Sequence, residues 1–128
     1  MTRTPPRPTE AELEILRVLW ERGPSTVRQV HEALAVARET GYTTTLKLMQ
    51  IMADKGLVTR DESSRTHIYT PRASQESTQQ QLVSDLVTRA FGGSAAELVL
   101  RALSAHTASD DELAEIRKLI EEEQEGRR

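Results

Sequence analysis

Residues 41–56 place two kinds of side chain on opposite faces of one predicted helix. A glycine turn precedes the helix, and Gly56 should end it, since glycine is favoured at helix C-termini. At about 100° per residue, one face collects the core-forming side chains Tyr42, Thr45, Leu46, Met49, Met52 and Ala53. The opposite face carries Thr43, Thr44, Lys47, Gln50 and Ile51. We therefore expect the first face to pack against the core and the second to remain open.

The open face is chemically unusual for a solvated helix. It presents small hydroxyl groups, one amide and one cation near the helix start. Such groups donate to phosphates and contact base edges without steric bulk. We therefore predict a recognition helix in a DNA major groove, with Thr43, Thr44, Lys47 and Gln50 as DNA-binding residues. The alternative is an ordinary solvated amphipathic helix.

Two further helices are predicted before this one. Thr9 and Glu12 have capping-box spacing. The helix they open should run to about Glu21 and end at Gly23-Pro24. Its buried side is expected to consist of Leu13, Leu16, Leu19 and Trp20.

A second capping box, formed by Thr26 and Gln29, opens a helix over about residues 27–38. Its apolar stripe is expected to be Val27, Val30, Leu34 and Ala37. Arg28 lies near the exposed start of this helix, where a backbone phosphate can bind. With the helix after Gly41, the order is that of a helix-turn-helix motif.

After Gly56 the apolar period changes to that of strands. Residues 57–60 and 66–70 are rich in β-formers, a polar turn over 61–65 joins them, and Pro71 should terminate the module. Two strands after a third helix make a wing, and Arg60, Ser63 and Arg65 are its candidate DNA contacts. The alternative is a solvent-exposed hairpin without a ligand.

The back half reads as a set of short amphipathic helices. Residues 74–81 are a linker or the exposed start of a helix, and Ser94-x-x-Glu97 and Ser109-x-x-Glu112 are further capping boxes. About 45 residues are too few to bury a comfortable core alone, so a second copy of the chain should cover the apolar faces. The alternative is packing on the front half within a monomer. The candidate dimerisation residues are Leu82, Leu86, Phe91, Leu98, Leu103, Leu113, Ile116, Leu119 and Ile120.

Composition limits the other classes of function. The chain has no cysteine, which excludes disulfides and thiolate metal sites and suits a reducing cytoplasm. No catalytic grouping or ligand-like histidine spacing occurs, so we expect no enzyme, no metal and no cofactor. No apolar run approaches a membrane span of about 20 residues, so no direct membrane binding is expected. Residues 1–73 carry net charge +2 and residues 74–128 carry −5, which suggests two different tasks.

The predicted fold class is mainly α, an α+β winged helix-turn-helix domain followed by a small all-helical dimerisation domain. The boundaries expected are 1–8 for a flexible arm, 9–73 for the winged helix and 74–128 for the helical domain. A winged-helix module that binds another protein is the alternative function. Against it, the open helix face has Ile51 as its one apolar anchor.

The chain also resembles a known family, the penicillinase repressors of BlaI/MecI/CopY type. The resemblance covers about residues 8–122 and rests on 9–20, 25–34, 42–52 and the 55–58 exit. It implies a winged-helix repressor that dimerises through its C-terminal helices and binds palindromic operators at promoters of resistance or stress genes. Where some members carry an arginine in the DNA-contacting helix, this chain has Leu46, so its base preferences should differ.

The resemblance further implies how repression is relieved. In antibiotic-responsive members a membrane sensor protease signals cleavage in the C-terminal region, and the matching stretch here is 98–102. Those members have an Asn-Phe junction where this chain has Arg101 and Ala102, which puts cleavage and the β-lactam signal in question. The C-terminal cysteines of copper-responsive members are missing, so thiolate copper sensing is excluded. The operator, the regulated genes and the inducing signal are not encoded in any recognisable motif.

Overall fold

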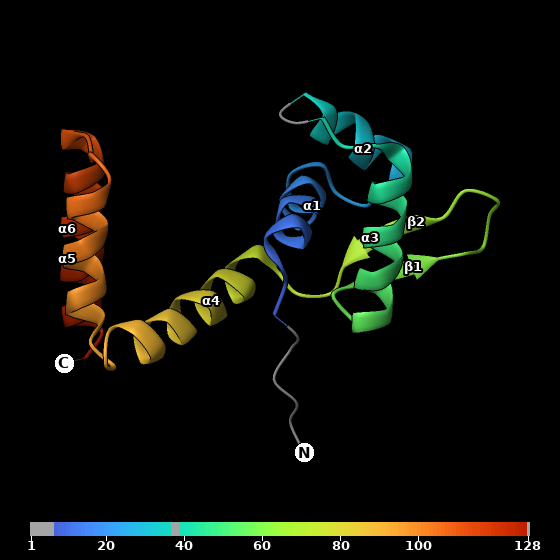
Figure 1. Cartoon of the computed structure of the whole chain (residues 1–128). Helices are drawn as coiled ribbons and strands as arrows, with labels where there is room; N and C mark the ends of the chain where they lie inside the picture. The colour runs from blue at the N-terminus through green and yellow to red at the C-terminus, as the bar shows by residue number, and fades with distance from the viewer. Residues whose placement is uncertain (1–6, 37–38, 128) are drawn as a thin grey trace, which may run out of the picture. The chain divides into compact units, whose positions relative to one another are not determined.

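The computed structural model describes residues 7–36 and 39–127, and these form six helices and one β-hairpin (Figure 1). The predicted class, mainly helical with a small sheet, is confirmed. Two compact units divide the chain, residues 1–82 and 83–128. Of the predicted arm, all but Arg7 and Pro8 lies outside the described residues. The elements are α1 (Glu10–Arg22), α2 (Val27–Ala35), α3 (Tyr42–Lys55), β1 (Val58–Asp61), β2 (Ile68–Pro71), α4 (Gln75–Ala90), α5 (Ala95–Ala105) and α6 (Asp110–Glu125).

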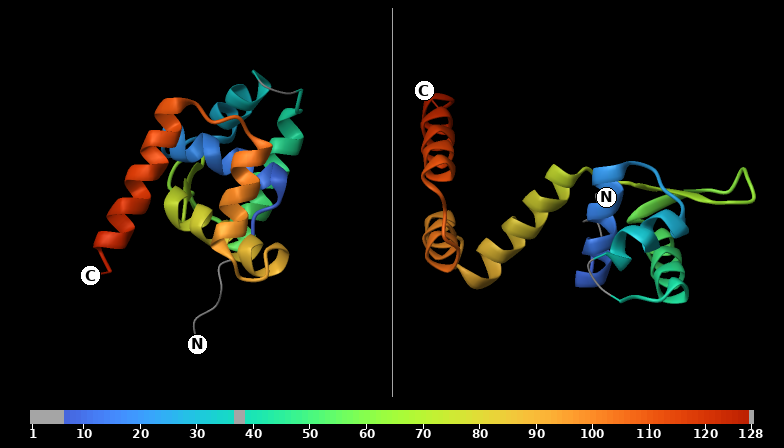
Figure 2. Two further views of the ribbon diagram at one scale, coloured as in Figure 1. Left: turned by 90° about the vertical axis from the view of Figure 1, so that its left-hand side faces the viewer. Right: turned by 90° about the horizontal axis from the view of Figure 1, so that it is seen from above.

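Helices α1, α2 and α3 pack on one another in the first unit, and the hairpin packs against α1 and α3 at its base (Figure 1). Beyond that base the turn of the hairpin projects away from the helices, as the view from above shows (Figure 2). Ser25 adds a single bridge to Tyr69, with backbone bonds of 3.1 and 2.8 Å. The buried apolar core consists of Ile15, Leu16, Leu19, Val27, Val30, Met49, Met52, Leu57, Val58 and Tyr69.

The predicted caps explain where these helices begin. Thr9 and Glu12 close a reciprocal capping box, and so do Thr26 and Gln29. Helix α3 has no side-chain cap, because its N-cap residue is Gly41. It ends as predicted at Gly56, whose backbone is left-handed at φ 85°, a conformation that favours glycine.

Three details of the helical prediction need correction. Ile15, missing from the predicted buried side of α1, is 1% exposed. Tyr42, assigned to the buried face of α3, is 40% exposed because it lies at the helix start, beyond the core. Helix α2 ends at Ala35, earlier than predicted. Ala37, the last residue of the expected apolar stripe, and Arg38, the expected end of the helix, lie outside the described residues.

The hairpin forms, with its strands shifted from the predicted ranges. Leu57 precedes β1, because its N–H bonds to the Met52 carbonyl at 2.9 Å and closes the end of α3. Thr66 and His67 belong to the turn, whereas Pro71 is the last residue of β2 and pairs with Val58. Proline is tolerated there because it lies at the end of a strand, where it need not donate to the ladder.

The second unit contains the second half of α4 together with α5 and α6. Of the two predicted alternatives for residues 74–81, the start of a helix is correct, since α4 begins at Gln75. This start is exposed as predicted except at Thr78, which is 8% exposed, and at the half-buried Gln81. Ser94 and Ser109 cap α5 and α6 by accepting the N–H groups of Glu97 and Glu112, each at 3.1 Å. No residue described between 83 and 127 is fully buried. In the described part of the chain, none of the helices has the length and apolar character to cross a membrane.

Candidate nucleic-acid interface

The open face of α3 is exposed as the sequence predicts. Thr43, Thr44, Lys47 and Gln50 are all solvent-exposed, while Thr45, Met49 and Met52 on the opposite face are buried. Ile51 is 38% exposed beside them. The helix therefore offers hydroxyl, amide and ammonium groups on a rigid, core-anchored scaffold.

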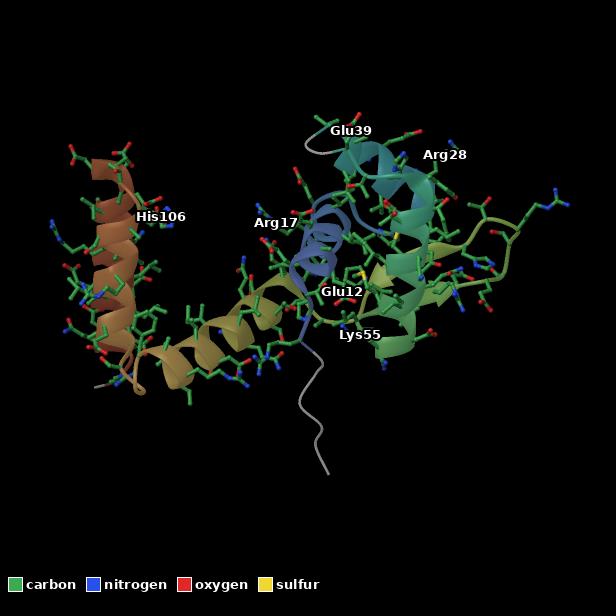
Figure 3. All side chains as sticks on the ribbon, in the orientation of Figure 1. Glu12, Arg17, Arg28, Glu39, Lys55 and His106 are labelled. Carbon is green, nitrogen blue, oxygen red and sulfur yellow. The ribbon has the colours of Figure 1, made fainter. Side chains whose placement is uncertain are left out.

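The last turn of α3 is held by a partly buried ion pair with α1. The Lys55 ammonium lies 2.7 Å from Oε1 of Glu12, whose side chain is 2% exposed (Figure 3). The same carboxylate accepts the backbone N–H of Thr9 at 2.8 Å, so one side chain caps α1 and fixes α3. Sequence patterning identified Glu12 only as a cap, because its partner is 43 residues away.

Opposing effects set the ionisation of Glu12. Burial of the carboxyl group acts to raise its pKa, but the hydrogen bonds from Lys55 and the Thr9 backbone, with the charge of Lys55, outweigh burial. The pKa of Glu12 therefore lies below its ordinary value, and its carboxyl group is ionised at neutral pH.

The wing candidates differ in how far their side chains are already engaged. The Arg60 guanidinium lies 2.8 Å from Glu62. A hydrogen bond with Tyr69 and the charge of Glu62 raise the pKa of Arg60. Arg60 is thus bound within the hairpin, while Arg65 is exposed at the turn.

The wing turn is shaped by short-range hydrogen bonds. The Ser63 N–H donates to the Asp61 carboxylate at 2.9 Å, and the Ser64 hydroxyl donates to the Thr66 carbonyl at 2.8 Å. Bonding to Ser63 lowers the pKa of Asp61. Ser63 therefore holds the turn through both its backbone and its side chain, although the residue as a whole is exposed.

Some of the predicted residues meet in one recess. Arg28 from α2, Gln50 from α3 and Arg65 from the wing line a recess of about 530 Å³. Thr43, Thr44 and Lys47 do not line it, nor do Arg60 and Ser63. Tyr42 also lines the recess, and the sequence prediction missed it because helical periodicity assigned its ring to the core.

The candidate dimerisation residues form no closed core in the second unit. Leu86, Leu103, Leu113, Leu119 and Ile120 are between 38% and 57% exposed. Leu82, Phe91, Leu98 and Ile116 are half-buried. Val99 of α5 and Ile116, Leu119 and Ile120 of α6 line an apolar groove of about 390 Å³. Arg101 and Ala102, in the predicted cleavage region, are exposed within α5.

Comparison with known proteins gives consistent matches. The family model described as "Penicillinase repressor" matches residues 8–122. The transcriptional regulator BlaI of Mycobacterium tuberculosis is 43% identical over 63 residues, 48% of this chain and 46% of that protein. The match thus spans about half the length of those mycobacterial relatives. A penicillinase repressor of Bacillus licheniformis is 22% identical over 117 residues, 91% of each chain.

Solved structures match the first part of the fold. The monomeric form of Bacillus licheniformis BlaI, solved in solution in complex with the blaP half-operator, aligns with a TM-score of 0.51 at 21% identity. That alignment covers 59% of this chain and 92% of the other. The solution structure of the DNA-binding domain of the repressor BlaI aligns with a TM-score of 0.51 at 22% identity, covering 58% and 90%. At such identity the likeness establishes the winged-helix fold.

Proposed function

The chain belongs to the penicillinase repressor family, and from this premise we propose that it is a homodimeric, sequence-specific transcriptional repressor. It binds a palindromic operator in promoters of resistance or stress genes. The observation that carries the proposal is the exposed face of α3, where Thr43, Thr44, Lys47 and Gln50 project from a helix anchored by the core. A family relative of the same fold was solved bound to a half-operator, which supports DNA as the ligand.

The proposed contacts fall into two groups. Thr43, Thr44 and Gln50 read base edges in the major groove, since hydroxyl and amide groups pair with bases there. Lys47 and the recess arginines, Arg28 and Arg65, hold backbone phosphates, which sets register and affinity. Arg60 and Ser63 mainly stabilise the wing through contacts inside the hairpin. We propose that they contact the DNA backbone only at the edge of the interface. In this division, residues 9–73 bind DNA and residues 74–128 dimerise.

Dimerisation is proposed because the second unit lacks a core of its own among the described residues. Each large apolar side chain that becomes buried contributes roughly 1.5–3 kcal/mol. Leu86, Leu119 and Ile120 are about half-exposed in the single chain. Their burial against a second copy of the chain would therefore add stability. Two winged helices on one dimer also bind two half-sites together, which raises affinity through effective concentration.

Relief of repression is proposed to follow loss of the C-terminal helices. Arg101 and Ala102 are exposed but lie inside hydrogen-bonded α5, so a protease must first unwind that helix locally. A cut there would detach α6 and the end of α5, which carry Leu103, Leu113, Ile116, Leu119 and Ile120. A membrane sensor protease is the proposed partner for this step, and the repressor itself acts in the cytoplasm.

The direct test is fluorescence anisotropy of the purified protein on duplex DNA from its own upstream region, compared with a scrambled duplex across a salt series. Tighter binding to the upstream duplex that persists near physiological salt is expected. Equal and salt-fragile binding to both duplexes would contradict sequence-specific reading at that region. Absence of binding to any duplex, including a randomised pool, would favour a protein-interaction module.

Sedimentation tests the assembly. The native protein should sediment as a dimer at micromolar concentration, and Leu86→Asp should give monomers with much weaker operator binding. Ser84→Asp, a charge introduced at an exposed polar position of the same helix, is the matched control and should remain dimeric. A monomeric native protein would overturn the model.

A further inference from the structure

The recess beside α3 draws on three separate segments of the first unit. It is lined by the start of α2, the outer side of α3 and the wing with β2. Its volume of about 530 Å³ exceeds that of a single water or small ion and admits a phosphate with part of its attached sugars. The lining residues are Thr26, Val27, Arg28, Tyr42, Leu46, Gln50, Arg65, Thr66, His67 and Tyr69.

The recess is a cationic site. Two of its ten lining residues are arginines and none is a carboxylic acid. Arg60, by contrast, is not among them and is neutralised by Glu62 at 2.8 Å. Guanidinium groups present a planar fork of N–H donors that matches phosphate oxygens. The chemistry of the lining therefore favours an anion with several oxygens.

An aromatic ring orients one of these arginines. The guanidinium carbon of Arg28 lies 5.5 Å from the centroid of the Tyr42 ring, within the range of a cation–π contact. The Tyr42 ring in turn meets His31 edge-on, with centroids 5.7 Å apart and planes at 85°. Arg28 and His31 belong to α2, and Tyr42 is the first residue of α3, so these two contacts join the start of α3 to α2. Figure 3 shows Arg28 on the outer side of α2.

We propose that this recess binds one backbone phosphate of the DNA duplex, and that Tyr42 positions Arg28 for it. The proposal rests on the proposed DNA-binding function and names a site within it. Arg28 and Arg65 donate to the phosphate from two different segments. Tyr42 acts through Arg28: its ring restricts the guanidinium to the recess, so less conformational freedom is lost when DNA binds. Because α2, α3 and the wing share one phosphate, the site fixes how deeply α3 enters the groove.

A double-mutant cycle on the full chain tests the role of Tyr42. Affinity for the best-bound duplex is measured by anisotropy across a salt series. Arg28→Ala should lower the slope of log K against log salt by about 0.9, the value for one phosphate contact. Tyr42→Leu should weaken binding about threefold, as expected for loss of a cation–π contact at an exposed position. Tyr42→Phe, which keeps the ring, should bind DNA as tightly as the wild type.

The coupling between the two residues is the decisive quantity. In an Arg28→Ala background, Tyr42→Leu should have no further effect on DNA affinity, because in this proposal Tyr42 acts on DNA through Arg28 and its contact with His31 serves only the packing of α2 on α3. Arg17→Ala removes an exposed arginine of α1 that does not line the recess, and it should leave the slope unchanged. Trp20 fluorescence on heating should show that every variant keeps the wild-type melting temperature. Additive losses, or a failure of Tyr42→Phe to restore binding, would overturn the positioning role.

Neutral phosphates test the site itself. Single methylphosphonate linkages are placed one at a time along the duplex. At one position per half-site, wild type should lose affinity while the Arg28→Ala and Arg65→Ala variants lose little. If both variants lose as much as wild type at every position, the recess does not hold a phosphate, although duplex binding stands. If wild type binds no duplex, the proposed function itself fails.

Discussion

We predict that the two residues of the Glu12–Lys55 ion pair differ in what their replacement costs: loss of Lys55 should lower the free energy of unfolding more than loss of the Glu12 charge. Lys55→Met leaves the Glu12 carboxylate ionised and 2% exposed without its cation. Removing one partner of a fully buried pair costs about 3–5 kcal/mol. Lys55 is 33% exposed, so water reaches this pair, and a cost of about 2–3 kcal/mol is expected. Glu12→Gln keeps the acceptor for Thr9 and loses only charge assistance, about 1–1.5 kcal/mol.

Urea unfolding followed by Trp20 fluorescence measures these costs. Trp20 is the single tryptophan of the chain, and its indole N–H donates to the Ala73 carbonyl at 3.1 Å, so it reports on the first unit. Lys47→Met is the matched control, since it alters an exposed lysine of the same helix and should change stability by less than about 0.5 kcal/mol. The double variant Glu12→Gln/Lys55→Met should cost less than the sum of the single variants.

The pH dependence supplies a second test of the pair. The pKa of Glu12 is lower in the folded chain than its ordinary value of 4.5. Its stabilisation is therefore complete above about pH 4.5 and is lost as pH falls through the folded-state pKa. Glu12→Gln should lack this acid-sensitive component. The reasoning is refuted if Lys55→Met costs no more than Glu12→Gln, or if Glu12→Gln leaves the acid dependence unchanged.

Four further predictions address the DNA interface, the assembly and the fold. Lys47→Ala should weaken binding to all duplexes and lower the salt slope by about 0.9, and an unchanged slope would show that Lys47 does not contact phosphate. Thr44→Ala should reduce discrimination between the operator and a mutated operator by about 1 kcal/mol, whereas equal losses on both would exclude base reading. Ending the chain after Arg101 should give monomers by sedimentation and weak operator binding, and a dimeric product would place the interface elsewhere. Gly56→Ala should cost about 1–2 kcal/mol in urea unfolding because φ is 85°, with Gly41→Ala as a control at a position that needs no left-handed backbone.

Local signals in the sequence predicted most of the first unit correctly. Thr9 and Thr26 begin helices as capping boxes, and Gly56 ends α3, because each acts through hydrogen bonds within a few residues. The exposed face of α3 follows from helical periodicity alone. These features could be predicted because the interactions that determine them lie within the segment concerned.

The remaining features depend on contacts between distant segments. Helical periodicity places Tyr42 on the buried face, but this first residue of α3 lies outside the core, and Arg28 and His31 contact its ring instead. Glu12 reads as a cap, and nothing near it in the sequence indicates Lys55. The recess likewise combines residues from α2, α3 and the wing, so its cationic character emerges only when the fold brings Arg28 and Arg65 together.

The distribution of charge bears on how a chain of net charge −3 can act on DNA. Salt screens exposed charges beyond about 8–10 Å, so a bound duplex responds to the charges close to it rather than to the total. Those charges include Lys47 on α3 and the recess arginines Arg28 and Arg65, whereas the acid of the exposed face, Asp54, lies toward the far end of the helix. The lining of the recess itself contains no acid. A small number of phosphate contacts also limits affinity for random DNA, because that affinity comes almost wholly from such contacts. Weak non-specific binding would make the base reading proposed for Thr43, Thr44 and Gln50 a larger share of the total affinity, which favours an operator over the excess of competing sites.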